Sequence, residues 1–102
     1  MREETSSQEL QVELPEEIAE GVYVNLAVVG HSSWEFVLDF IRVMPGMPKA
    51  SVKSRVILAP EHAKRLLYAL KENIYNYEAE MGGIKLREEN ELLPLGNVKG
   101  EA

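Results

Sequence analysis

The chain has 102 residues, and its 17 acidic and 11 basic side chains give a formal net charge of −6 at pH 7. This length fits one small domain, and a hydrophobic content of 45% is typical of a globular protein rather than a disordered one. The chain contains no cysteine, which excludes disulfides, zinc–thiolate sites, iron–sulfur clusters and a cysteine nucleophile. No apolar run approaches the roughly 20 residues of a membrane helix and no signal-peptide pattern opens the sequence, so we expect a cytoplasmic protein.

The acidity is concentrated at the start of the chain. Residues 1–20 hold seven Glu against a single Arg, whereas residues 21–82 sum to +1. We expect residues 1–17 to form a flexible acidic arm, in which the weak alternation of residues 8–14 is compatible with an edge strand that ends at Pro15. Two interpretations of this arm stay open: a solubilising tail, or a segment that docks on a basic partner or on the chain's own basic surface.

Three segments rich in β-branched and aromatic residues predict strands over residues 22–29, 34–44 and 51–59. Glycine and serine predict a turn between the first two, and a proline- and glycine-rich loop covers residues 45–50. The second strand places its bulkiest side chains on one face, which we expect to meet the core. These are Trp34, Phe36, Leu38 and Phe40, and from the third strand Val52, Val56 and Leu58.

The facing of these strands predicts their register. If the second and third strands form a hairpin, matching core faces require that paired residue numbers sum to an even value. A sum of 94 satisfies this and places opposite charges directly across from each other on the outer face. This register pairs Phe36 with Leu58, Leu38 with Val56, and Asp39 with Arg55.

A long helix is predicted over residues 60–81. Pro60 suits the first helical position, Glu61 complements the positive end of the helix dipole, and a pair of glycines after residue 81 supplies the stop. At about 1.5 Å per residue the helix is about 33 Å long, which exceeds the width of a three-strand sheet. We expect it to lie along the strands and to be covered for about two-thirds of its length. Its apolar stripe consists of Ala63, Leu66, Leu67, Leu70, Ile74, Tyr77 and Met81.

The fold class indicated is α+β: an antiparallel sheet of three to four strands followed by one long helix, in a domain of residues 18–86 with a loose tail over residues 87–102. Such a sheet and helix form only a marginal core, and the apolar outer face and overlong helix call for a partner. We therefore expect a homodimer. The candidate interface residues are Val37, Ile41, Val43, Tyr68, Tyr75, Tyr77 and Met81.

Candidate catalytic groups are sparse, and we expect no enzyme, metal or cofactor. His31 lies beside Ser32 in a turn, but no G-x-S-x-G elbow is present, and His62 lies on a different element. Glu35 and Asp39 are about 13 Å apart along a strand, which exceeds the spacing of a glycosidase pair. The glycines follow no phosphate-loop pattern. The basic residues near the hairpin loop are a possible anion contact: Arg42, Lys49, Lys53 and Arg55.

A set of spaced residues over roughly residues 18–86 resembles a family. It comprises Tyr23-x-Asn25, Ser33-x-Glu35-Phe36-x-Leu38-Asp39-Phe40, Val52-x-Ser54-Arg55-Val56, Pro60-x-His62-Ala63-Lys64, Leu70, Tyr77-Glu78 and Gly82-x-Ile84. The pattern is similar to a small uncharacterised bacterial family, domain of unknown function 3467. The resemblance implies a fold and transfers no catalytic residue.

The order of elements is also similar in layout to the SecB-type export chaperones, which bind unfolded chains in apolar grooves. Three functions are compatible with the sequence. The first is a non-catalytic oligomeric binding or scaffolding module with a protein partner. The alternatives are a SecB-like chaperone and a nucleic-acid accessory protein that uses residues 42–55. The overall acidity disfavours a nucleic-acid partner, but the charge of +1 over residues 21–82 does not exclude one, and no membrane partner is expected.

Overall fold

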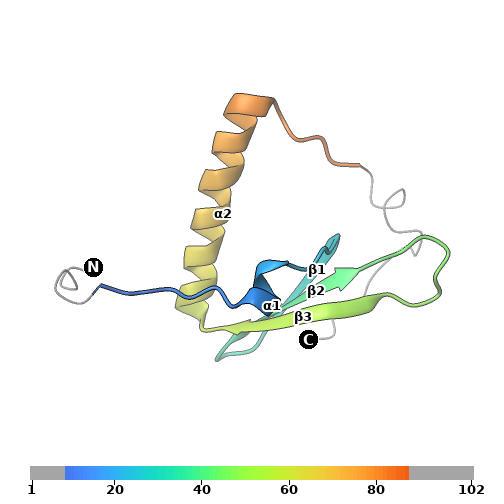
Figure 1. Cartoon of the computed structure of the whole chain (residues 1–102), viewed down its shortest axis with the longest axis horizontal. Helices are drawn as coiled ribbons and strands as arrows, with labels where there is room; N and C mark the ends of the chain where they lie inside the picture. Colours follow the sequence, from blue (N-terminus) through green and yellow to red (C-terminus); the bar gives the residue numbers. More distant parts are fainter. Residues whose placement is uncertain (1–8, 88–102) are drawn as a thin grey trace.

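A computed structural model describes residues 9–87 (Figure 1). The predicted α+β layout is confirmed: a three-stranded antiparallel sheet with strand order β1-β2-β3 is followed by a long helix. The elements are α1 (Glu16–Ala19), β1 (Leu26–His31), β2 (Phe36–Arg42), β3 (Ser51–Leu58) and α2 (Pro60–Met81).

The segment before β1 differs from the sequence prediction. Residues 9–15 join no sheet, so the edge strand considered for residues 8–14 is not formed in the part that the structure describes. The short helix α1 instead follows Pro15, whose carbonyl accepts hydrogen bonds from the N–H groups of Ile18 and Ala19. Two glutamates in its first turn suit the positive end of the helix dipole.

The strand β1 begins later than predicted, because Asn25 closes the end of the sheet with its side chain. Its amide nitrogen donates to the carbonyl of Val43 at 3.0 Å, and its amide oxygen accepts from the N–H of Val43 at 2.8 Å. The side chain thus makes the hydrogen bonds that a further pair of strand residues would make. Residues 22–24 are thereby released from the ladder.

The predicted register of β2 and β3 is confirmed from Phe36–Leu58 through Phe40–Ser54, including the pair of Asp39 with Arg55. A bulge then shifts the pairing, so that Ile41 faces Val52. The prediction that Val52 points to the core face with Val56 is therefore wrong. The bulge moves Val52 to the opposite face, where it is 53% exposed.

The sheet consequently has two faces that we name by position. The helix-side face carries Val29, Phe36, Leu38, Phe40, Val56 and Leu58. The outer face carries Val28, Val37, Asp39, Ile41, Val52 and Arg55.

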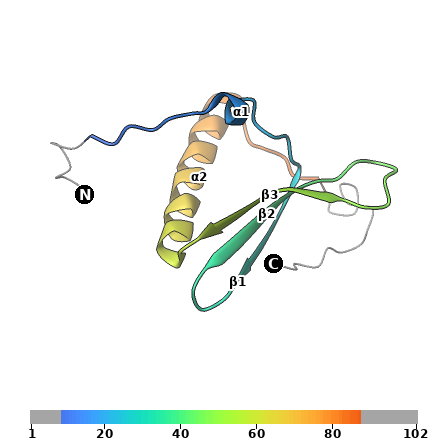
Figure 2. The ribbon, with the colours of Figure 1, turned by 60° about the horizontal axis from the view of Figure 1, so that its bottom comes forward.

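The bounds of α2 agree with the prediction, but its position does not. Figures 1 and 2 show α2 rising steeply from the end of β3, so it does not lie along the strands. The connection explains this, since Ala59 is the single residue between β3 and α2 and has an extended backbone, as residues before proline prefer. A helix that reverses over its own sheet ordinarily needs a loop of about 2–6 residues.

The core within the described residues is small. Leu38 and Ile41 are its buried apolar side chains, and no residue of α2 is buried. Trp34, which the alternation places on the core face, lies in the turn before β2 and is 81% exposed. Among residues 9–87, none of the helices has the length and apolar character needed to cross a membrane.

Candidate interaction groove

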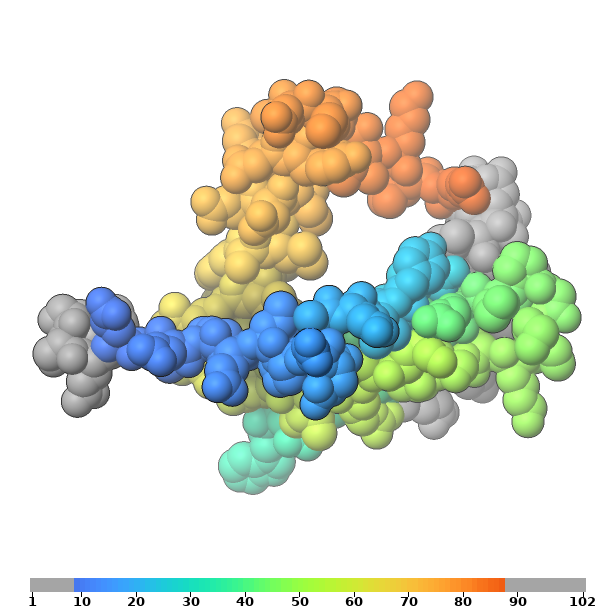
Figure 3. Space-filling model, in the orientation of Figure 1, coloured from blue at the N-terminus to red at the C-terminus, as the bar shows by residue number. Residues whose placement is uncertain are grey.

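An open apolar groove of about 630 Å³ lies between α2 and the helix-side face of the sheet. Figure 3 shows the hollow between the rising helix and the strands. We call it the interaction groove. Its lining consists of Val29, Phe36 and Leu38 from the sheet and Pro60, Ala63, Lys64, Leu66, Leu67 and Leu70 from the first half of α2.

Alternation and helical periodicity bring these side chains together. Val29 pairs with Leu38 across β1 and β2, and Phe36 follows two residues from Leu38, so the three share one face. Spacings of three and four residues place the leucines of α2 on the side of the helix that faces them. Lys64 is the charged residue of the lining, so the groove suits an apolar partner rather than an ion.

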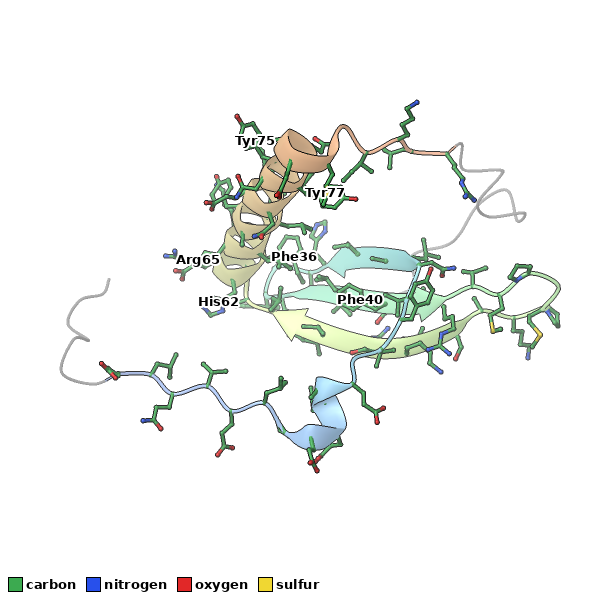
Figure 4. All side chains as sticks on the ribbon, turned by 45° about the horizontal axis from the view of Figure 1, so that its top comes forward. Phe36, Phe40, His62, Arg65, Tyr75 and Tyr77 are labelled. Carbon is green, nitrogen blue, oxygen red and sulfur yellow. The ribbon has the colours of Figure 1, made fainter. Side chains whose placement is uncertain are left out.

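The apolar surface continues beyond the groove along α2. A second depression of about 380 Å³ is lined by Asn73, Ile74, Tyr77 and Ile84. Ile84 is tied to the end of α2, because Glu78 accepts a hydrogen bond from the N–H of Ile84 at 2.8 Å. Figure 4 shows Phe36 at the foot of α2 and Tyr77 higher up on the side toward the sheet, whereas His62, Arg65 and Tyr75 point the other way.

The candidate interface residues from the sequence do not form one surface. Val37, Ile41 and Val43 belong to the outer face or its end, and Ile41 is already buried within the chain at 8% exposure. Tyr77 and Met81 lie on the α2 stripe and are exposed. The other candidates from α2, which are also exposed, are Tyr68 and Tyr75.

The four candidate anion-binding residues differ in their contacts: two of them bind other groups of the chain, and two are exposed. Arg55 makes a bidentate ion pair with Asp39, with distances of 2.6 and 2.8 Å, and Arg42 donates from Nε to the carbonyl of Tyr23 at 3.2 Å. Lys49 and Lys53 are exposed near the loop. The structure therefore assigns two of the four side chains to contacts within the chain.

The ion pair also determines the chemistry of the Asp39 carboxyl. Asp39 is 3% exposed, and its hydrogen bonds with Arg55, aided by the positive charge of that side chain, lower the pKa of the carboxyl despite the opposing effect of burial. Asp39 is thus a structural anion that ties β2 to β3.

The turn residues considered as catalytic candidates, His31 and Ser32, make contacts that stabilise the fold. Ser32 Oγ accepts hydrogen bonds from the N–H groups of Trp34 and Glu35, which stabilises the turn between β1 and β2. The ring of His31 stacks on Phe36 with centroids 5.3 Å apart. Within residues 9–87 there is no cluster of three or more His, Asp or Glu side chains that could hold a metal ion.

Sequence reasoning did not find the groove, although it found most of the helical stripe. The sequence did not predict the angle between α2 and the sheet. If α2 lay on the strands, the same leucines would form an ordinary core. One feature of the sequence indicates this angle. A strand-forming run ends at Leu58, and Pro60, which begins the helix, follows after a single residue.

Comparison with known proteins relates the chain to a family over residues 1–86, a span that includes the acidic arm of residues 1–17 left outside the motif resemblance. No curated protein and no solved structure matched the chain. The chain belongs to the family described as "Protein of unknown function (DUF3467)".

Proposed function

We propose that the protein is a non-catalytic binding or scaffolding module that works as a homodimer. The observation that carries the proposal is the interaction groove together with the apolar stripe of α2, both of which are open to solvent in the single chain. Monomeric proteins rarely expose contiguous apolar patches above a few hundred Å². A second copy is the occupant that fits best, because one chain offers both a sheet face without a covering helix and a helix without a supporting sheet.

The sizes of the two surfaces support a dimer. A 22-residue helix is about 33 Å long and about 10 Å wide, which gives one face of about 330 Å². Three strands about 4.8 Å apart and seven residues long present a face of similar size. The footprint of both together, about 650 Å², approaches the roughly 800 Å² that each partner buries in a stable complex.

The experiment is a determination of mass by light scattering and native mass spectrometry, from low to high micromolar concentration. A mass of two chains supports the proposal, and a stable single-chain mass throughout contradicts it.

A second measurement separates the homodimer from a chaperone-like use of the same groove. The proposed dimer covers its groove, so the protein should not suppress aggregation of a reduced, unfolding client protein. Suppression at near-stoichiometric ratio by a single-chain species would show instead that unfolded segments occupy the groove, and would overturn the homodimer.

A further inference from the structure

The occupant of the interaction groove can be specified further. We infer that two copies exchange their long helices, so that α2 of each copy lies in the groove of the other, against Val29, Phe36 and Leu38. This inference rests on the homodimer proposed above and adds the arrangement of its interface.

The first argument is the connection between β3 and α2. With Ala59 as the single linking residue and Pro60 as the first residue of α2, the helix is directed away from its own sheet. Within one chain its stripe faces the helix-side face across the open groove without packing on it, and closing that gap requires a longer loop. Short connections that prevent an element from folding back are a common origin of exchange between protomers.

The second argument is the fit between groove and helix. A helix about 10 Å across, sunk to half its depth, fills 630 Å³ with about 16 Å of its length, which is about three turns. The segment from Leu67 to Ile74 spans about 12 Å of helix and fits within this length. Its stripe residues Leu67, Leu70 and Ile74 are 39–55% exposed in the single chain. The groove can therefore take the middle of the α2 stripe.

The third argument is symmetry. A two-fold axis makes the two contacts identical, since the α2 of each copy enters the other's groove and both grooves are filled at once. A one-way insertion would leave one groove and one helix uncovered and would continue into open chains of molecules.

The test uses the absence of native cysteine, so that introduced thiols are unique. Val29→Cys and Leu70→Cys are made in separate chains, one of which carries a tag that changes its mass. Both sites are more than half exposed in the single chain, so the substitutions are compatible with folding. The two chains are unfolded together in urea, refolded as a mixture and treated with a short bis-maleimide.

Helix exchange predicts a cross-linked product with the mass of one tagged and one untagged chain. The matched control replaces the helical partner by Asn76→Cys, which lies on the polar side of α2 and should give at least tenfold less product. Leu67→Cys serves as a second helical site if the Leu70→Cys chain fails to refold.

The outcomes separate the two proposals. A two-chain mass with no link between Val29→Cys and either helical site contradicts helix exchange and leaves the homodimer standing. Efficient linking of Val29→Cys chains to each other would mean that the two sheets face each other, which also overturns the exchange. A single-chain mass contradicts both proposals.

Discussion

Truncation of Leu70 to alanine measures how much of the α2 stripe is covered in solution. Leu70 is 55% exposed in the single chain, so a little under half of its side chain is buried there. Burial of a whole leucine contributes about 1.5–3 kcal/mol, which makes the expected loss in an isolated chain about 0.7–1.4 kcal/mol. In the exchanged dimer that we propose, the same side chain would be buried, and Leu→Ala would then cost about 2–5 kcal/mol per chain.

The assay is urea unfolding followed by far-ultraviolet circular dichroism, at three protein concentrations that span a hundredfold range. The dimer predicts a loss of at least 2 kcal/mol per chain and a midpoint that rises with protein concentration, because dissociation accompanies unfolding. The reference variant is Asn76→Ala, on the polar side of α2, with an expected change within about 0.5 kcal/mol. A loss below about 1.4 kcal/mol with a midpoint independent of concentration would refute the reasoning, since it is the result for an uncovered helix.

Three further outcomes are expected. Asp39→Asn removes the ion pair with Arg55. Because the pKa of Asp39 is lowered in the folded chain, the variant loses most stability above about pH 4, and the loss disappears as the pH falls through the folded-state pKa. Thermal unfolding measured at a series of pH values tests this dependence. An equal deficit at pH 7 and pH 2 would contradict this. Gly82→Ala places a Cβ at φ +97°, where its surroundings are open, so the cost of about 1–3 kcal/mol is conformational and is measured as a lower Tm. Leu38→Ala, at a site 9% exposed, should cost about 2–5 kcal/mol in chemical unfolding, whereas Trp34→Ala, at 81% exposure, should change stability by about 0.5 kcal/mol or less.

The features that the sequence predicts correctly are those determined within a few residues or across one strand pair. Pro60 and Gly82 delimit α2 because one lacks an N–H and the other can adopt a positive φ. The pairing of Asp39 with Arg55 follows because the alternating pattern permits only every second register. The helix ends and the strand register therefore depend on residues that are identifiable in the sequence.

The features that escaped prediction depend on geometry that no single pattern carries. The bulge after Phe40 places Val52 on the opposite face from Val56, although the two residues fit one alternating pattern in the sequence. The side-chain hydrogen bonds of Asn25 delay the start of β1, although the preceding residues Val22 and Val24 have strong strand propensity. In each case a specific contact overrides a local preference.

The small core and the separated helix have one physical cause. A chain of this size normally covers one sheet face with its own helix, and here the residues of the stripe and of the helix-side face have the composition to do so. The one-residue connection at Ala59 prevents this packing, so the apolar side chains of α2 and of the helix-side face stay exposed to solvent. In the homodimer that we propose, the helix of each chain would meet the uncovered sheet of the other, and the same packing would form between molecules. In that proposed dimer the groove is half of a core rather than a site for a small ligand.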